Sequence, residues 1–281
     1  MRFKIARLLP IPLALLIVSL TGIYQVYSKT GDIFLRDVDL KGGISLTLLF
    51  NTTIELSELE SVLRRKIESF ILSSSKTSEG FILVRILAEK NVDTQEIMSF
   101  LNSNNFYPIE YSIQFVGPEL GTLFFSQIAT LLIIAYILLF LTNLFIYKNP
   151  IVGFTIILSS LTNIIAVFGI MNWLNQKISF AGFSSLLMLI AFAIDTNVIL
   201  ATKVLSSPKE EFYEQYKKGL ITGITINTGL VISMLIVLFL TNSSFLINIA
   251  QIQIIGFSAD IINTWILNAA LIEVMLLGKK H

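Results

Sequence analysis

The 281-residue chain contains no cysteine and a single histidine, His281. The absence of cysteine excludes disulfide bonds, thiol catalysis, iron–sulfur clusters and zinc sites built from thiolates. A single histidine also excludes metal sites made of several histidines and catalytic triads that use histidine as the base. Any chemistry must therefore come from carboxylates, amides, hydroxyls or the main chain.

Charged residues are scarce as well: they make up 14% of the chain, whereas 54% of the residues are hydrophobic. A typical soluble domain carries about 25% charged residues, and the mean hydropathy here is +0.78. The 20 basic and 19 acidic side chains leave a net charge of +1. A nucleic-acid-binding protein would present a basic surface, so nucleic acid is not an expected partner. The composition indicates a membrane protein.

Six stretches are apolar enough and long enough to cross a bilayer, which takes about 20 predominantly apolar residues. They cover residues 8–27, 120–147, 151–174, 179–202, 219–240 and 249–277. The first stretch follows three basic residues, so a secretory signal peptide is its alternative interpretation. An uncleaved span is favoured because the apolar run is long and no small-x-small cleavage site precedes Lys29.

The basic residues that flank the spans predict the orientation. With the N-terminus inside, the two short outer loops carry one basic residue, Lys177, and the inner segments carry ten. These ten are Arg2, Lys4, Arg7, Lys148, Lys203, Lys209, Lys217, Lys218, Lys279 and Lys280. We therefore expect a multi-pass protein of the cell membrane with both termini in the cytoplasm. Residues 203–218 are expected to form an amphipathic connector on the inner surface.

The long segment between the first two spans is predicted to be an extracytoplasmic domain. We divide the chain into residues 1–29 (N-terminus and first span), 30–118 (outer domain) and 119–281 (five-helix bundle). β-Rich patterns predict strands over residues 44–50, 70–74, 81–87 and 109–116, and helical spacing predicts helices from residue 56 and over 94–104. The strand at 70–74 could instead continue the preceding helix. The order β-α-β-β-α-β is typical of a ferredoxin-like α+β sandwich.

Several carboxylates and amides lie at similar depth inside the spans. They are Asn163 in the third span, Asp195 and Asn197 in the fourth, Asn227 in the fifth, and Asp260 and Asn263 in the sixth. Ionisable groups inside a membrane are costly and usually functional. Alternatively, amides and hydroxyls only hold helices together, at about 1 kcal/mol or less per hydrogen bond. For Asn163 this second interpretation is favoured.

No lysine or arginine lies inside the predicted spans to neutralise the two aspartates. Loss of hydration disfavours the charged form of a carboxyl group. Either at least one aspartate is protonated at neutral pH or a partner subunit supplies a cation, and both suit a proton-coupled machine. Glu273 lies near the inner end of the sixth span and is expected to reach the lipid headgroups.

Four sequence motifs, in this order, resemble those of the SecD/SecF family of the RND superfamily, and of its archaeal SecF type in particular. They are Asp39-Leu40-Lys41-Gly42-Gly43, Val116-Gly117-Pro118-Glu119-Leu120-Gly121, Ile194-Asp195-Thr196-Asn197-Val198, and the run Ala259-Asp260, Asn263-Thr264-Trp265, Asn268-Ala269. The first resembles a family element whose glycines suit a tight turn. The second resembles the hinge into the second span, and the third resembles the motif that carries the family's membrane carboxylate.

The resemblance covers the chain almost end to end and implies an accessory subunit of the Sec protein-export pathway. It implies pairing with SecD in a twelve-span complex beside the SecY channel, and coupling to the proton gradient. The outer domain would contact unfolded secretory polypeptide or SecD, and the spans would contact membrane lipid. We expect Asp195, Thr196 and Asn197 to form the proton-linked element. Asp260, Asn263 and Asn227 are the expected supporting neighbours.

Two other classes stay open. A small-molecule or lipid exporter of the same superfamily is disfavoured because the outer region offers only one domain and no second lobe for a substrate pocket. A structural scaffold would use Asp195 and Asp260 only to bond helices together. The sequence offers no nucleophile–base pair and no metal-ligand set, so we expect neither an enzyme nor a cofactor.

Overall fold

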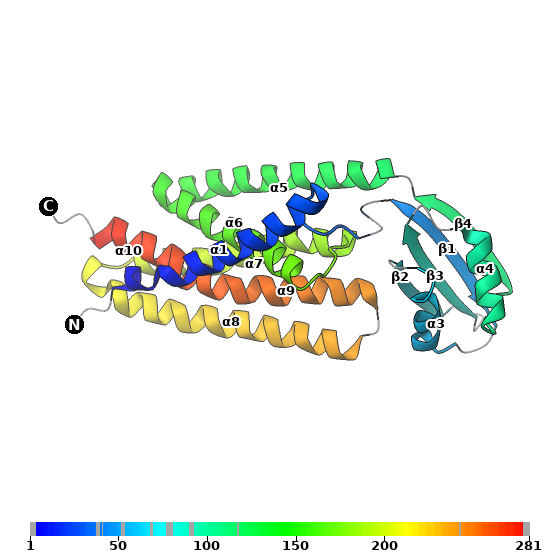
Figure 1. Ribbon diagram of the computed structural model, residues 1–281. Coiled ribbons are helices and arrows are strands. Elements are labelled where there is room, and N and C mark those ends of the chain that lie inside the picture. Colours follow the sequence, from blue (N-terminus) through cyan, green and yellow to red (C-terminus); the bar gives the residue numbers. More distant parts are fainter. Residues whose placement is uncertain are drawn as a thin grey trace.

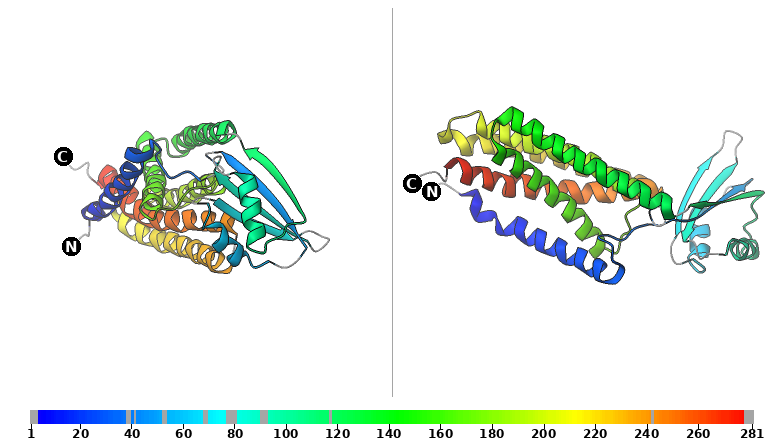
Figure 2. Two further views of the ribbon diagram at one scale, coloured as in Figure 1. Left: turned by 45° about the vertical axis from the view of Figure 1, so that its right-hand side comes forward. Right: turned by 90° about the horizontal axis from the view of Figure 1, so that it is seen from above.

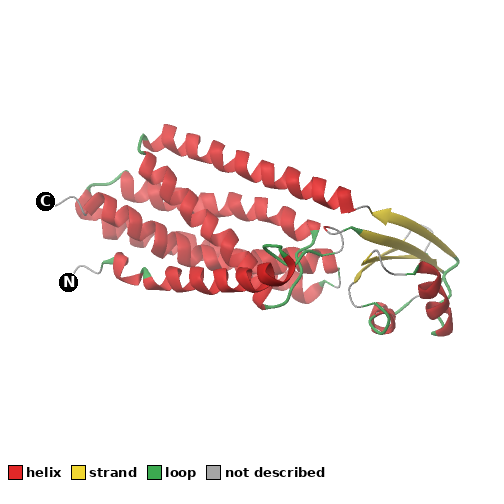
Figure 3. Ribbon diagram, turned by 45° about the horizontal axis from the view of Figure 1, so that its top comes forward, coloured by secondary structure: helices red, strands yellow, loops and turns green. Residues whose placement is uncertain are grey.

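The structure is a computed structural model that describes residues 4–37, 40, 42–51, 54–67, 70–76, 81–89, 93–116, 118–241 and 243–277. A long helical bundle carries a small α/β domain at one end, and both termini lie at the other end (Figures 1 and 3). Within the described residues, six helices are long and apolar enough to cross a membrane. The chain is thus a mostly helical, multi-pass membrane protein, as predicted.

The six predicted spans are all present, with ends that differ by a few residues. The helices of the bundle are η1 (Ile5–Leu8), α1 (Pro10–Thr30), α5 (Pro118–Tyr147), α6 (Pro150–Trp173), α7 (Phe180–Leu205), η2 (Lys209–Glu211), α8 (Phe212–Leu240), α9 (Ser244–Ile262), η3 (Asn263–Asn268) and α10 (Ala269–Leu277). The prediction of a connector over residues 203–218 is wrong in extent. α8 begins at Phe212, whose ring is buried in the bundle, so only a short link with η2 remains.

Helix α6 is the centre of the bundle. In its most apolar stretch 61% of the residues are buried, against 11% in α5 and in α8. A close approach of α6 to α1 depends on glycine: a Cβ atom on Gly22 would lie 2.6 Å from Cδ1 of Trp173. The peripheral helices α5 and α8 therefore expose most of their surface in this single chain.

The α/β domain contains β1 (Gly43–Phe50), α3 (Leu56–Leu63), β2 (Phe70–Lys76), β3 (Ile82–Glu89), α4 (Thr94–Ser103) and β4 (Glu110–Val116). The four strands form one antiparallel sheet in the order β2-β3-β1-β4, with Leu46 of β1 opposite Ile86 of β3 and Ile113 of β4. All four predicted strands are present. The alternative in which the first helix continues through residues 70–74 is wrong, because α3 ends at Leu63.

Helices α3 and α4 cover one face of the sheet (Figure 2). Alternate residues of β1 and β3 point toward them, so that Leu48 and Val84 are fully buried together with Leu59 of α3 and Leu101 of α4. Asp93 is the N-cap of α4, since its carboxylate accepts from the Gln95 N–H at 2.9 Å. Burial of this apolar face holds the domain together.

The segment that links α1 to β1 is fixed to the bundle. Ile178, between α6 and α7, donates its N–H to the Leu35 oxygen at 2.7 Å and accepts from the Asp37 N–H at 3.0 Å. Asn172 donates to the Ile33 oxygen at 2.9 Å, and the Phe34 ring is buried against the ring of Phe168.

The glycine motifs lie at the two connections between the bundle and the domain. Gly42 has a φ of +83° and turns the chain into β1, whose first residue is Gly43. Pro118 begins α5, and Gly121 lies in its first turns. Asp39 and Gly117 lie outside the described residues.

Candidate functional site

A buried polar cluster surrounds Asp260 of α9, which is 1% exposed. Its Oδ1 accepts from Asn163 Nδ2 of α6 and from Thr264 Oγ1 of η3, each at 2.8 Å. Its Oδ2 lies 2.7 Å from Thr196 Oγ1 of α7 and accepts from Asn227 Nδ2 of α8 at 2.8 Å. One carboxyl group thus connects α9 with three other membrane helices.

A second set of amides holds the first in place. Asn263 donates to Asn163 Oδ1 at 2.7 Å, which fixes the amide that in turn donates to Asp260. On α7, Asn197 accepts from Asn268 at 2.5 Å and donates to the main-chain oxygen of Ala193 at 2.6 Å. These side chains are buried, so each of these hydrogen bonds takes the place of one that the polar group would otherwise form with water.

The cluster is adjacent to a π-helical segment, η3. π-Helical turns are rare and occur frequently at functional sites. The ring of Trp265 in η3 packs against Gly219 and Gly223 of α8, and a Cβ atom on Gly223 would overlap that ring. The Tyr216 hydroxyl, on the same face of α8, donates to the Trp265 main-chain oxygen at 2.8 Å. These contacts set the position of α8 relative to Asp260.

The structure separates the residues that the sequence predicts to be proton-linked. Thr196, Asn227 and Asp260 meet directly, and Asn197 and Asn263 lie in the second set of amides. Asp195 is exposed on the opposite face of α7, and it makes no hydrogen bond or ion pair among the described residues. Asp195 lies on the exposed face of α7 with Ala191 and Thr202, whereas Thr196 and Asn197 lie on the buried face.

Three residues have a larger part in the buried cluster than the sequence predicted. Asn163 was expected only to hold helices together, yet it donates to Asp260. Thr264 and Asn268 stand four and eight residues after Asp260, a helical spacing that could have placed them on the same face as the carboxylate. No group of three or more histidine, aspartate or glutamate side chains able to hold a metal occurs in the described part of the chain.

The expectation that Glu273 reaches the headgroups is wrong. Its side chain is 4% exposed, because η1 and the start of α8 cover it. The carboxylate accepts from the main-chain N–H of Ala6 at 2.9 Å and from the Tyr213 hydroxyl at 2.5 Å. Glu273 therefore joins the N-terminal segment, α8 and α10 at the end of the bundle where both termini lie.

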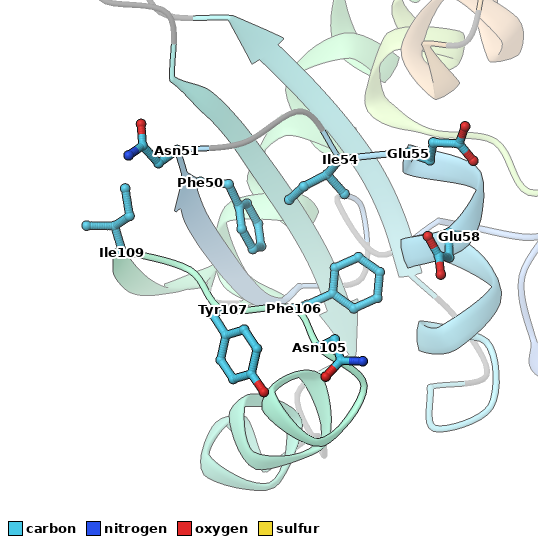
Figure 4. Close-up of a pocket in the computed structure, with 9 residues that line it drawn as sticks. All are labelled: Phe50, Asn51, Ile54, Glu55, Glu58, Asn105, Phe106, Tyr107 and Ile109. Carbon is cyan, nitrogen blue, oxygen red and sulfur yellow. The ribbon is translucent and has the colours of Figure 1, made fainter.

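A groove of about 480 Å³ opens in the α/β domain at the end of the sheet remote from the bundle (Figure 4). Its lining combines apolar and aromatic side chains with two carboxylates and two amides. The residues are Phe50, Asn51, Ile54, Glu55, Glu58, Asn105, Phe106, Tyr107 and Ile109. Tyr107 and Ile109 are 66% and 54% exposed, so the groove offers accessible apolar surface beside negative charge.

Two relatives are similar over nearly their whole length. The protein-export membrane protein SecF of Methanocaldococcus jannaschii is 28% identical over 278 residues, which cover 96% of this chain and 95% of that protein. The protein of the same name from Methanothermobacter thermautotrophicus is 27% identical over 272 residues, covering 95% of this chain and 91% of the relative.

Solved structures of SecDF share the fold. The crystal structure of SecDF in its super-membrane-facing form has a TM-score of 0.75 at 16% identity, over 100% of this chain and 39% of that one. SecDF from Thermus thermophilus has a TM-score of 0.70 at 18% identity, over 97% of this chain and 38% of that one. This chain thus spans less than half of a SecDF chain.

The family model described as "Protein export membrane protein SecD/SecF, C-terminal" matches residues 97–278. That segment includes α5 to α10 and every residue of the Asp260 cluster. The chain therefore belongs to the SecD/SecF family of protein-export membrane proteins.

Proposed function

We propose that the chain is a SecF-type accessory subunit of the Sec translocase, which assists protein export across the cell membrane. Supporting this, the family match covers the whole of α5 to α10, and the relatives named SecF match almost end to end. We expect no enzymatic reaction, because the sequence offers no nucleophile–base pair.

The partner that this proposal requires is SecD. This chain covers 39% of a SecDF chain. We therefore expect the remaining part of SecDF to correspond to a separate subunit. The exposed face of α7 supports this assignment, since it carries Asp195 beside Ala191 and Thr202. Small residues allow close helix contact, and a carboxylate on such a face needs a donor or cation that a second subunit would supply.

The proposed orientation has both termini in the cytoplasm and a ferredoxin-like domain over residues 30–118 on the outer side, before the bundle of residues 119–281. Three observations support it. The predicted inner segments hold ten basic residues against one in the short outer loops, both termini lie at the same end of the bundle, and the antiparallel strand order β2-β3-β1-β4 is that of a ferredoxin-like sandwich.

Coupling to the proton gradient is the proposed role of the membrane carboxylates. The observation that carries it is the burial of Asp260 at the meeting point of α6, α7, α8 and α9, with four hydrogen-bond partners and no basic one among the described residues. A change of charge at this point would alter the contacts of all four helices. Thr196, Asn197, Asn227 and Asn263 would transmit that change, and Asp195 would act at the surface shared with SecD.

Outside the membrane, the α/β domain would contact unfolded polypeptide as it leaves the SecY channel. The groove beside Glu55 and Glu58 suits an extended segment with apolar and basic side chains, because it pairs exposed apolar surface with negative charge.

Copurification from native membranes tests the proposed function. A tagged chain should recover SecD and SecY, as identified by mass spectrometry, and an Asp195→Asn variant should recover both but support less export. Recovery of neither protein would favour a stand-alone exporter. Undiminished export by Asp195→Asn would contradict the role proposed for Asp195, and undiminished export by Asp260→Asn as well would favour a scaffold, since an amide still forms hydrogen bonds.

A further inference from the structure

The hydroxyl of Thr196 lies between two acceptors. Its Oγ1 is 2.7 Å from Asp260 Oδ2 and 3.0 Å from the main-chain oxygen of Ala193, one turn earlier in α7. A hydroxyl carries one proton and two lone pairs, so it donates to only one of these oxygens at a time and can accept a hydrogen bond as well. The position therefore allows two arrangements of hydrogen bonds with the same heavy-atom geometry.

We propose that Asp260 Oδ2 is the proton-binding atom of the bundle, and that the Thr196 hydroxyl reverses its hydrogen bond as the proton arrives and leaves. The proposal deepens the proposed coupling to the proton gradient and rests on it for its biological use. It differs from the expectation drawn from the sequence, in which Asp195 carries the proton.

In the charged form, Thr196 donates to Asp260 Oδ2. The carboxylate then receives four hydrogen bonds, from Thr196, Asn227, Asn163 and Thr264. Four is about the number of lone-pair positions on a carboxylate. The main-chain oxygen of Ala193 still accepts a hydrogen bond from Asn197 Nδ2, so it keeps one side-chain donor. The charged form is therefore fully hydrogen-bonded without a basic partner.

In the neutral form, a new O–H bond at Asp260 Oδ2 donates to Thr196 Oγ1, and the Thr196 proton turns to the Ala193 oxygen. Asn163 and Thr264 continue to donate to Oδ1. Asn227 Nδ2 can continue to donate to Oδ2, because the oxygen of the new O–H group still carries lone pairs. Both protonation states thus keep their hydrogen bonds, as a reversible proton site requires.

Other titratable groups on the surrounding helices do not face Asp260. Helix α6 contains none. On α7, Asp195 is exposed on the opposite face, and Lys203 lies two turns further along. On α8, the titratable side chains are confined to residues 213–218, at the end of the bundle that holds the termini, where Tyr213 binds Glu273 of α10. Among the described residues, the side chains that bind Asp260 are therefore all uncharged.

Proton binding would change the contact between α7 and α9. The charged form joins Thr196 of α7 to Asp260 through a charge-assisted hydrogen bond, which is about twice as strong as a neutral one. The neutral form weakens that link and turns the Thr196 proton back to its own helix. Asp195 precedes Thr196 in α7, so a small rotation of α7 would also move Asp195 and the face that we propose to contact SecD.

Infrared difference spectroscopy between acidic and alkaline pH tests the proposal on the full chain in lipid vesicles, without any export assay. Beside the bands of the exposed carboxyl groups, which titrate as well, we expect a titrating carbonyl band of a buried protonated carboxyl group. The band should be lost in Asp260→Asn and should move to higher frequency in Thr196→Val, where the acid proton has lost its acceptor. In Thr196→Ser, which keeps the hydroxyl, the wild-type band should return.

Three variants serve as controls and should leave the band unchanged. Asp195→Asn and Glu273→Gln remove the two other carboxylates of the six predicted spans, and Thr225→Val removes a hydroxyl that bonds the Ile221 oxygen on an exposed face. A difference spectrum of Asp260→Asn that is identical to that of the wild type would overturn the proposal, as would loss of the assigned band in Asp195→Asn or Glu273→Gln. A normal band without recovery of SecD or SecY would refute the export function and leave the proton site intact.

Discussion

The Tyr216 hydroxyl of α8 donates to the main-chain oxygen of Trp265 at 2.8 Å, within the π-helical segment η3. A π-helical turn displaces the regular i→i+4 bonds of an α-helix, and this side chain provides the Trp265 carbonyl with a partner from another helix. Tyr216 thereby fixes the register between α8 and the helix that carries Asp260.

The first prediction concerns this hydroxyl. Tyr216→Phe should lower the free energy of unfolding by about 1–2 kcal/mol, because a buried carbonyl loses its donor. Thermal unfolding in detergent measures the change. Tyr24→Phe is the matched control, since Tyr24 is 71% exposed on α1 and should be neutral. Equal effects of both variants would contradict the assigned role.

The second prediction concerns the glycine under the Trp265 ring. Gly223→Ala should destabilise the bundle by about 1–3 kcal/mol, because the added methyl group overlaps the indole. Gly229→Ala on the same helix meets nothing within 4 Å and should be neutral or stabilising by up to about 1 kcal/mol, since alanine favours the helix. Adding Trp265→Phe to Gly223→Ala should restore part of the loss.

The third prediction concerns Asn163, which links Asp260 to Asn263. Asn163→Ala should cost about 2–3 kcal/mol, because it removes a donor from the carboxyl group and an acceptor from Asn263. A double-mutant cycle with Asp260→Ala measures the coupling between the two side chains. Additive effects would mean that the hydrogen bond between them contributes nothing to stability.

The fourth prediction concerns the N-terminal segment. Glu273→Gln and Tyr213→Phe should each lower stability by about 1 kcal/mol, and together they should lower it by less than the sum, since they break one shared contact. Proteolysis within residues 4–9 should accelerate in Glu273→Gln. Glu214→Gln, at an exposed ion pair with Lys218, is the matched control and should change neither measurement.

The fifth prediction concerns the outer groove. A photo-crosslinking residue placed at Tyr107 should label a translocating polypeptide, whereas the same residue at the exposed Tyr24 of α1 should not. Replacing Glu55 and Glu58 by Gln should reduce labelling, most of all for basic polypeptides at low salt, where exposed charges are least screened. Labelling of SecD in place of polypeptide would show that the groove is a subunit interface.

Hydropathy and periodicity were sufficient to predict the spans and the order of strands and helices along the outer domain, because both depend on local spacing. They did not indicate which face of α7 turns inward, and the two neighbours Asp195 and Thr196 differ only in that respect. The π-helical turn at Asn263–Asn268 also left no local signal, since it forms through contacts with α8. The burial of Glu273 was not predicted because the residues that cover it, Ala6 and Tyr213, lie far away in the sequence.

The segments on the two sides of the α/β domain make different contacts with the bundle. The segment before β1 is held at Ile178 by main-chain hydrogen bonds on both sides, whereas β4 leads toward α5, a helix that packs chiefly against α6. The domain is thus tied to the bundle before β1 by hydrogen bonds to the link between α6 and α7, and after β4 through α5. We expect a displacement of the domain to reach the core helix α6 from both of these sides.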